Sequence, residues 1–164
     1  MPVTNEEFRS ALARFASGVT VVTTIDDEGT PFGLTVSAFC SVSLEPPLVL
    51  VCIDKSTRCH HAFGESRRYI VNFLNEGQQE VSERFATQLE NKFDGIDYTS
   101  SPEGLPVLAD AVAVLECRLT EAYEGGDHTI FVAEVERAIV NGGKPLLYFG
   151  GEYGSMGEGE PAAE

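Results

Sequence analysis

Residues Gly33–Ile53 read GLTVSAFCSVSLEPPLVLVCI and contain two neighbouring segments that favour β structure but differ in pattern. The second, Leu48–Ile53, is apolar at every position, which is typical of a strand buried on both faces. The first alternates, so one face of the predicted strand carries Phe39 and a row of hydroxyl side chains. The hydroxyl residues are Thr35, Ser37, Ser41 and Ser43.

A row of hydroxyls beside a buried strand has two interpretations. It can be the solvated face of a half-buried strand, which is the ordinary explanation of such a pattern. Phe39 and the apolar neighbouring strand instead favour a partly enclosed cleft, lined by short polar side chains and accessible backbone. Such a cleft suits a flat heteroaromatic ligand with a polar tail.

The segment after the apolar strand, Asp54–Arg58 (DKSTR), offers groups that bind anions. Lys55 supplies a cation, Ser56 and Thr57 supply hydroxyls, and a helix beginning here would add backbone N–H donors. A Ser-Thr pair before a helix is more often only a cap. Its position directly after the hydroxyl strand favours the hypothesis of a phosphate site.

The flanking sequence predicts further strands and a few short helices. Thr4-x-x-Glu7 is a capping-box pattern before a predicted helix over Asn5–Ala16. Other helices are predicted to begin near Ser56 and to cover Gly77–Phe93, and residues 94–106 are expected to form a loop. The strands are predicted at residues 19–26, 32–43, 48–53, 68–74 and 144–154, and at two long segments around the turn 124–127. Because they cluster as hairpins and do not alternate with helices, they favour a β-barrel with peripheral helices over a doubly wound parallel sheet.

The composition indicates one globular domain. The 164 residues are 43% hydrophobic and 23% charged, and we expect a domain over residues 1–154 and a disordered acidic tail over residues 155–164. No stretch approaches the ~18 consecutive apolar residues of a membrane span. The N-terminal segment lacks the basic and apolar regions of a signal peptide, so a cytoplasmic location is expected.

Charge and cysteine usage exclude several classes of function. The chain has 26 acidic and 11 basic residues, for a net charge of -15, which disfavours nucleic acids and anionic membranes as partners. The four cysteines are far apart and are interpreted as reduced thiols. Cys59, His60 and His61 are adjacent, and adjacent residues on a helix point in different directions, so no metal site is expected.

Six sequence blocks carry a resemblance to a known family. They are FASGVTVVTT, GLTVSAFCSVSLEPPLVLVCI, YIVNFLNEGQQEVSERFA, KFDGI, GGDHTIFVAEV and PLLYFGGEY, in this order. Together they resemble the flavin reductase family of FMN-binding split barrels, and more narrowly the small reductase components of two-component flavin monooxygenases. The resemblance extends from about Phe8 to Tyr153. It implies a mainly β split barrel of the Greek-key type with a few peripheral helices.

The resemblance also implies an activity and partners. Members of this family are homodimers that bind flavin near the subunit interface and pass a hydride from NADH or NADPH to N5 of FMN or FAD. The reduced flavin then diffuses to a separate monooxygenase. The flavin performs the difficult chemistry, and the protein supplies binding, orientation and electrostatics. This chain lacks the C-terminal extension of some members, which leaves its nucleotide preference open.

The resemblance assigns the flavin site residue by residue. The family's flavin segment corresponds to Thr35, Val36, Ser37, Ala38, Ser41 and Ser43. Lys55, Ser56 and Thr57 match the phosphate region, and Arg84 and Phe85 match the ribityl–phosphate end. From pattern alone, Phe85 is equally well explained as helix core, and a solvated surface charge is the alternative for Arg84.

A second set of matches concerns the pyridine nucleotide. Gly126–His128 (GDH) matches a motif near the nicotinamide, and we expect His128 to position the nucleotide or to act electrostatically. Tyr148 and Tyr153 are expected to contact the nucleotide, with aromatic core packing as the simpler explanation.

Other functions remain open on the same fold. These are a flavin- or haem-binding carrier without turnover, a deazaflavin-dependent reductase, and an interaction module without a cofactor. The GDH motif favours the reductase, and an interaction module would leave the hydroxyl row unexplained.

Overall fold

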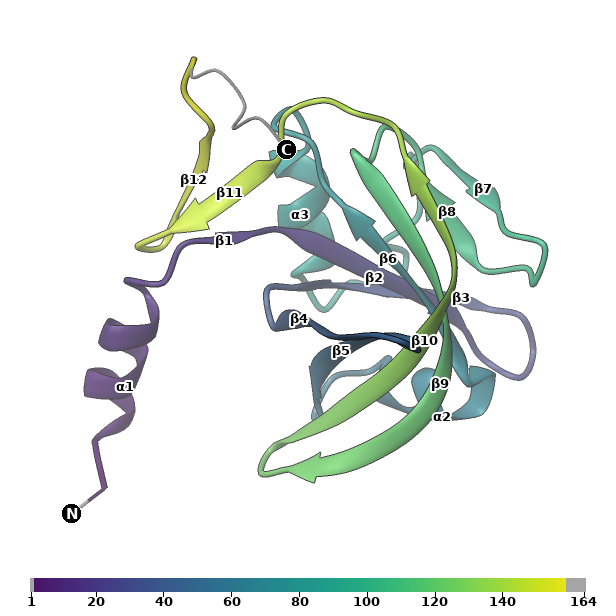
Figure 1. Cartoon of the computed structure of the whole chain (residues 1–164), viewed down its shortest axis with the longest axis horizontal. Helices are drawn as coiled ribbons and strands as arrows, with labels where there is room; N and C mark the ends of the chain where they lie inside the picture. Colours follow the sequence, from purple (N-terminus) through teal and green to yellow (C-terminus); the bar gives the residue numbers. More distant parts are fainter. Residues whose placement is uncertain (1, 159–164) are drawn as a thin grey trace.

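The computed structural model describes residues 2–158, and its centre is a seven-stranded antiparallel sheet in the order β3-β2-β6-β9-β10-β5-β4 (Figure 1). The strands are β2 (Thr20–Ile25), β3 (Pro31–Val36), β4 (Phe39–Leu44), β5 (Pro47–Asp54), β6 (Arg68–Phe73), β9 (Ala113–Gly125) and β10 (His128–Val140). The predicted long hairpin around residues 124–127 is confirmed as β9–β10.

A bend in the chain closes this sheet into a barrel. β3 and β4 follow each other in sequence but lie at opposite edges of the sheet. Only Ser37 and Ala38 separate them, and a link this short spans roughly 10 Å. The sheet must therefore curl until its two edges meet, which confirms the predicted split barrel.

The prediction of one continuous strand over residues 32–43 is wrong at this bend. Phe39 N donates to Ser37 O at 2.9 Å, which is a three-residue turn. β3 pairs with β2 before the turn, and β4 pairs with β5 after it. No Gly or Pro marks the turn, and every residue in it is compatible with a strand, so the pattern gave no sign of the break.

Two hydrophobic clusters hold the elements around the site in place. The barrel interior is filled by apolar side chains that include Val51, Phe63, Tyr69 and Phe131, with α2 (His60–Ser66) inserting Phe63 at one end. A second cluster, around Leu74 and Leu146, lies beneath α3. α3 (Gln79–Phe85) is shorter than the helix predicted over Gly77–Phe93, because the chain turns back after Ala86.

β5 differs from its prediction as a strand buried on both faces. Val49, Val51 and Ile53 face the interior and are buried, whereas Leu48, Leu50 and Cys52 are only partly buried on the outer face. The outer face of the neighbouring β10 continues this apolar surface with Ile130 and Val132. A single chain therefore leaves this apolar surface partly uncovered.

The N-terminal helix projects away from the barrel (Figure 1). α1 (Asn5–Leu12) begins at the predicted capping box, in which Glu7 N donates to Thr4 Oγ1 and Thr4 N donates to Glu7 Oε2. It ends before the predicted Ala16, because β1 (Ser17–Gly18) requires extended backbone to pair with β11. None of its residues is buried.

Short strands complete the fold. β11 (Leu146–Phe149) and β12 (Glu152–Ser155) form a hairpin where one strand was predicted, since Gly150 and Gly151 have the positive φ angles of a tight turn. β7 (Tyr98–Ser100) and β8 (Pro106–Leu108) lie in the region predicted as a loop. Of the predicted disordered tail, Ser155 belongs to β12 and residues 159–164 lie outside the described residues. Within residues 2–158, no helix is long and apolar enough to cross a membrane.

Candidate functional site

A cleft of about 400 Å³ opens between β3, the segment Thr57–Cys59 and the loop that follows α3. Its aromatic walls come from Phe32, Phe85 and Phe93. Its polar groups include the hydroxyls of Thr35 and Thr57, the cations of Arg58 and Lys92, and the carboxylate of Glu90. Aromatic walls with a few hydroxyls and cations suit a ligand that combines a flat ring with an anionic group.

A second hollow, of about 740 Å³, is a weaker candidate. Its lining is polar and includes Asn75, Gln78 and Asn141. The amide groups of all three donate to backbone carbonyls of the segment Ala109–Ala111 at 2.6–2.9 Å. These side chains already hold the protein's own backbone, so we place the candidate site at the first cleft.

Contacts between β3 and α3 form the floor of the first cleft. A Cβ atom at Gly33 would lie 2.8 Å from Phe85 Cε1, so only glycine lets the fully buried Phe85 ring pack here. Thr35 Oγ1 donates to Ser82 O at 2.5 Å and ties the strand to the helix. Phe93 then packs edge-on against Phe85, with ring centroids 5.0 Å apart.

Lys92 is the cation most enclosed by the cleft. Its Nζ donates to Gly33 O and Phe85 O, each at 3.1 Å, which leaves one of its three N–H groups for a ligand. Burial lowers the pKa of its ammonium group, while Cys59 opposes that shift. Across residues 2–158, no carboxylate forms an ion pair with it. Lys92 is not among the predicted site residues, although it lies in the block KFDGI.

The two arginines near the cleft have different roles. Arg58 lines it and forms an ion pair with Glu90 at 2.8 Å. Arg84 does not line it, and its guanidinium group instead donates to Lys92 O at 2.6 Å and to Asn91 O at 3.0 Å. Arg84 therefore fixes the loop that carries Lys92.

The predicted hydroxyl row is not one continuous face. Thr35 lines the cleft, but Ser37 and Ala38 are exposed at the bend. Ser41 is exposed and Ser43 is partly buried on β4, and a bulge between them interrupts the alternation. The prediction of a single face is wrong because the bend and the bulge each change which way side chains point. Val36 is buried, and its carbonyl accepts from Thr20 Oγ1.

The predicted phosphate residues are divided between two places. Thr57 lines the cleft, and its hydroxyl donates to Asp54 O at 2.8 Å. Lys55 instead forms an ion pair with Glu124 on the β9–β10 hairpin. Ser56 donates through both its backbone N–H and its hydroxyl to Asp54 Oδ1, and these bonds lower the pKa of the Asp54 carboxyl.

His128 lies near Lys55, at the start of β10. It is partly exposed, and its Nδ1 lies 2.7 Å from Asp127 Oδ1. It faces Asp54 across the β5–β10 pair. At the next residue of β10, Thr129 Oγ1 lies 2.8 Å from His60 Nε2. The β5 and β10 ends thus bring His128, Asp54 and Lys55 together, but outside the lining of the cleft.

Tyr148 and Tyr153, the two residues expected to contact the nucleotide, pack against each other on the β11–β12 hairpin, with ring centroids 5.2 Å apart. Tyr153 Oη shares a hydrogen bond of 2.8 Å with Ser82 Oγ, which places this hairpin beside α3. Tyr148 is exposed. Neither tyrosine lines the cleft.

Within residues 2–158, no group of three or more His, Cys, Asp or Glu side chains is arranged to hold a metal ion. His61 of the Cys59–His61 trio packs edge-on against Phe32, and Cys59 is buried. These residues are therefore occupied with packing, and the chemistry of the site rests on the cleft and its neighbours.

Comparison with known proteins identifies relatives of the whole domain. Residues 12–157 match the flavin reductase-like domain family. The chain is 45% identical over 150 residues to the FMN reductase (NADH) SmoA of Agrobacterium fabrum, covering 92% of this chain and 85% of SmoA. It is 42% identical over 147 residues to HsaB of Rhodococcus jostii, the reductase subunit of a flavin-dependent monooxygenase, covering 89% and 75% of the two chains.

A solved structure agrees with these sequence matches. The Streptomyces globisporus NADH:FAD oxidoreductase SgcE6, in complex with NAD and FAD fragments, superimposes with a TM-score of 0.89 at 35% identity. The superposition covers 98% of this chain and all of SgcE6 (100%).

Proposed function

This chain belongs to the flavin reductase-like domain family, and we propose that it uses NADH to reduce FMN or FAD for a separate monooxygenase. The observation that carries the proposal is the cleft between β3 and the loop after α3, whose aromatic, hydroxyl and cationic lining suits a flavin nucleotide. The names of SmoA and SgcE6 support NADH as the hydride donor, and the name of HsaB supports a monooxygenase as the recipient.

The residues present fit a flavin. Thr35, Thr57 and Lys92 supply hydroxyl and ammonium donors for the ribityl chain and phosphate. Ser37 at the bend and Ser41 beyond it supply exposed hydroxyls and backbone groups for the polar edge of the ring. Flavin, when bound, supplies the acceptor for the hydride. Ser37, Ser41 and neighbouring backbone N–H groups would then stabilise negative charge at the ring edge.

We assign His128 a positioning role toward the pyridine nucleotide. Asp127 holds its Nδ1, which fixes the ring and leaves Nε2 for a ligand. The transfer of a hydride needs no general base, so this contact orients the nucleotide and adjusts the local charge. Tyr148 and Tyr153 are proposed as the nucleotide's neighbours on the other side, held next to α3 by the bond from Tyr153 to Ser82.

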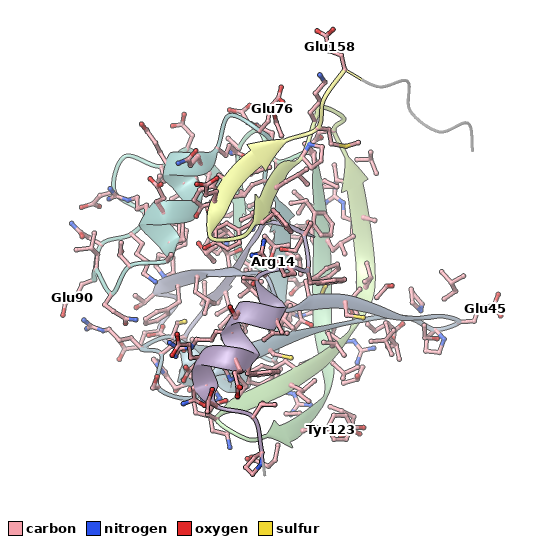
Figure 2. All side chains as sticks on the ribbon, turned by 90° about the vertical axis from the view of Figure 1, so that its left-hand side faces the viewer. Arg14, Glu45, Glu76, Glu90, Tyr123 and Glu158 are labelled. Carbon is pink, nitrogen blue, oxygen red and sulfur yellow. The ribbon has the colours of Figure 1, made fainter. Side chains whose placement is uncertain are left out.

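We further propose that the protein is a homodimer. The apolar side chains of α1 are exposed by 54% at Phe8 and 55% at Leu12. Figure 2 shows this side of the molecule, with the β4–β5 hairpin extending outward to Glu45. Val42 and Leu44 on that hairpin are also exposed, and large exposed apolar surfaces mark interfaces. A second copy would cover them and would give the exposed Ser41 of β4 a second wall.

A cytoplasmic location remains part of the proposal. Its support is that all four cysteines are free thiols, which is the usual state of cysteine in reducing compartments.

Steady-state consumption of NADH tests the function. With catalytic amounts of the protein, we expect NADH oxidation to depend on added FMN or FAD and to be faster than oxidation of NADPH. Adding catalase should return part of the oxygen consumed, since free reduced flavin reacts with oxygen. Flavin binding without any NADH or NADPH oxidation would reject the reductase and favour the carrier. Turnover with a deazaflavin alone would reject flavin as the substrate.

A further inference from the structure

We propose that the cleft between β3 and the loop after α3 binds the adenylate half of FAD, so that this protein prefers FAD to FMN. The inference rests on the proposed function, in which the flavin ring lies at the bend between β3 and β4. It goes further by choosing between the two flavins, which the relatives do not do, since SmoA is named for FMN and SgcE6 for FAD.

The length of β3 separates the ring from most of the cleft. A strand rises roughly 3.3 Å per residue, so the five-carbon ribityl chain covers about two to three residues. From Ser37 this reaches Thr35 or Leu34, next to Gly33, whose carbonyl accepts from Lys92 Nζ at 3.1 Å. The first phosphate is therefore expected beside Lys92. The part of the cleft lined by Thr30, Pro31 and Phe32 lies beyond that point.

The volume of the cleft exceeds the need of one phosphate group. A phosphate has about the size of three water molecules, or roughly 90 Å³ at about 30 Å³ each. The cleft holds about 400 Å³, which lies in the range of pockets that enclose whole small ligands. FMN would leave most of this space to water, whereas FAD brings a second phosphate, a ribose and a purine.

The lining matches these extra groups. Phe32 and Phe93 present aromatic surface from β3 and from the loop, and aromatic side chains stack on purine bases. Lys92 has no carboxylate partner among residues 2–158, in a chain with 26 acidic and 11 basic residues. Thr57 lines the same cleft, and so does Arg58, whose ion pair with Glu90 a diphosphate would replace. A diphosphate accepts from several such donors at once.

A substitution that fills the cleft tests this inference. Ala86 lines the cleft, is exposed and has right-handed helical backbone, so Ala86→Trp adds a large side chain without backbone strain. Thr30→Trp fills the cleft from the other wall. Ala138→Trp is the matched control, because Ala138 is equally exposed but lies on β10, outside the cleft. Affinities for FAD and FMN are measured by quenching of flavin fluorescence without any pyridine nucleotide.

We expect the wild-type protein and Ala138→Trp to bind FAD about tenfold or more tightly than FMN. Ala86→Trp or Thr30→Trp should remove this preference by weakening FAD alone. Equal affinity of the wild-type protein for the two flavins would overturn the inference. Equal loss of FAD and FMN in the filled variants would also overturn it, because the part of the cleft that they fill would then hold the ring or the shared phosphate and not the adenylate. If Ala86→Trp fails to fold, Thr30→Trp decides.

NADH-driven reduction of FMN and of FAD is measured in the same samples and tests the proposed reductase function separately. If wild-type protein reduces both flavins but shows no preference, only the cleft inference fails. If it reduces neither flavin while binding FAD more tightly, only the reductase function fails.

Discussion

Gly33 has no side chain at the point where β3 passes closest to α3. Gly33→Ala would place a Cβ 2.8 Å from Phe85 Cε1 and 3.3 Å from Phe93 Cζ. Since Phe85 is fully buried, we expect a loss of about 1–3 kcal/mol in the free energy of unfolding and weaker flavin binding. Denaturant unfolding and flavin titration measure the two effects. Gly64→Ala is the control, because nothing lies within 4 Å of a Cβ there. An unchanged unfolding midpoint in Gly33→Ala would contradict the tight packing.

Lys92 gives a second prediction at this scale. Lys92→Met removes the charge but keeps the length of the side chain, so flavin affinity should fall about tenfold as one charged contact is lost. Lys144→Met, at the second hollow, should leave affinity unchanged.

The pH dependence of binding follows from the same group. Burial lowers the pKa of Lys92 below its ordinary 10.5, so the ammonium group is lost at a lower pH than in an exposed lysine. Flavin affinity of the wild-type protein should therefore decline as pH rises through that lowered pKa, and Lys92→Met should lack this step. A parallel decline in both proteins would show that another group controls binding.

Some residues of the cleft were predicted from the sequence and others were not. Arg84 and Phe85 were selected from a motif, and Phe85 does line the cleft. Lys92 was not selected, because its place depends on a loop that folds back over α3 and is held by Arg84. That contact is not visible in local sequence patterns.

At the scale of elements, local patterns predicted most strands but not their ends. β2 and β10 are rich in β-branched residues, and the turn between β9 and β10 indicates a hairpin, so these strands were predicted. The break between β3 and β4 was missed, because a change of partner strand is decided by tertiary pairing. The capping box at Thr4 correctly predicted where α1 begins, but pairing of β1 with β11 decided where it ends.

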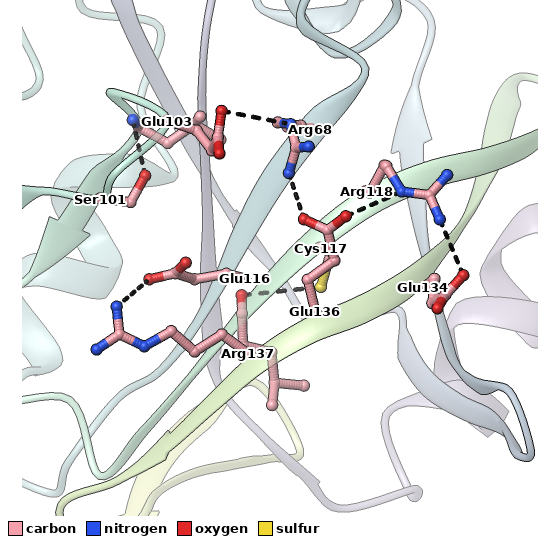
Figure 3. Close-up of polar contacts among 11 residues, drawn as sticks. Arg68, Ser101, Glu103, Glu116, Cys117, Arg118, Glu134, Glu136 and Arg137 are labelled. Atoms are coloured by element: carbon pink, nitrogen blue, oxygen red, sulfur yellow. Dashed lines mark hydrogen bonds and ion pairs between the residues drawn. The ribbon is translucent and has the colours of Figure 1, made fainter.

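Ion pairs link three strands across the outer surface of the sheet (Figure 3). Glu136 on β10 accepts from Arg68 on β6 at 2.5 Å and from Arg118 on β9 at 2.9 Å. The bond from Arg68 is the main cause that lowers the pKa of Glu136. Because the group is exposed and screened by solvent, Glu136→Gln should cost less than about 1 kcal/mol at neutral pH.

The lowered pKa of Glu136 predicts how its contribution to the free energy of unfolding changes with pH. A carboxylate whose pKa is lowered by folding stabilises the protein above its unfolded pKa, and this contribution is lost as pH falls through the folded pKa. The difference in unfolding free energy between wild-type protein and Glu136→Gln should therefore shrink in acid and at high salt. The exposed Glu121 on β9 provides a control as Glu121→Gln. A difference that persists in acid would assign the effect to packing.

At the scale of the whole molecule, the exposed apolar surface of α1 predicts association. We expect the wild-type protein to sediment at twice the mass of the chain, and Phe8→Asp combined with Leu12→Asp to shift it toward the monomer. The double variant loses only exposed contacts within one chain, so its barrel should still fold, as circular dichroism would show. Arg9→Gln on the same helix is the control. A wild-type monomer, or a double variant that stays dimeric, would contradict the proposed role of α1.

The most direct test of the whole account is anaerobic stopped-flow absorbance at the flavin band. Protein saturated with FAD is mixed with NADH, and then with NADPH, in the presence of excess flavin. We expect rapid bleaching with NADH, followed by continued reduction of the excess flavin as reduced flavin leaves and oxidised flavin replaces it. The Lys92→Met variant should bleach more slowly at limiting flavin. A flavin that binds in the cleft but keeps its colour with both nucleotides would contradict the central claim that this protein is a flavin reductase.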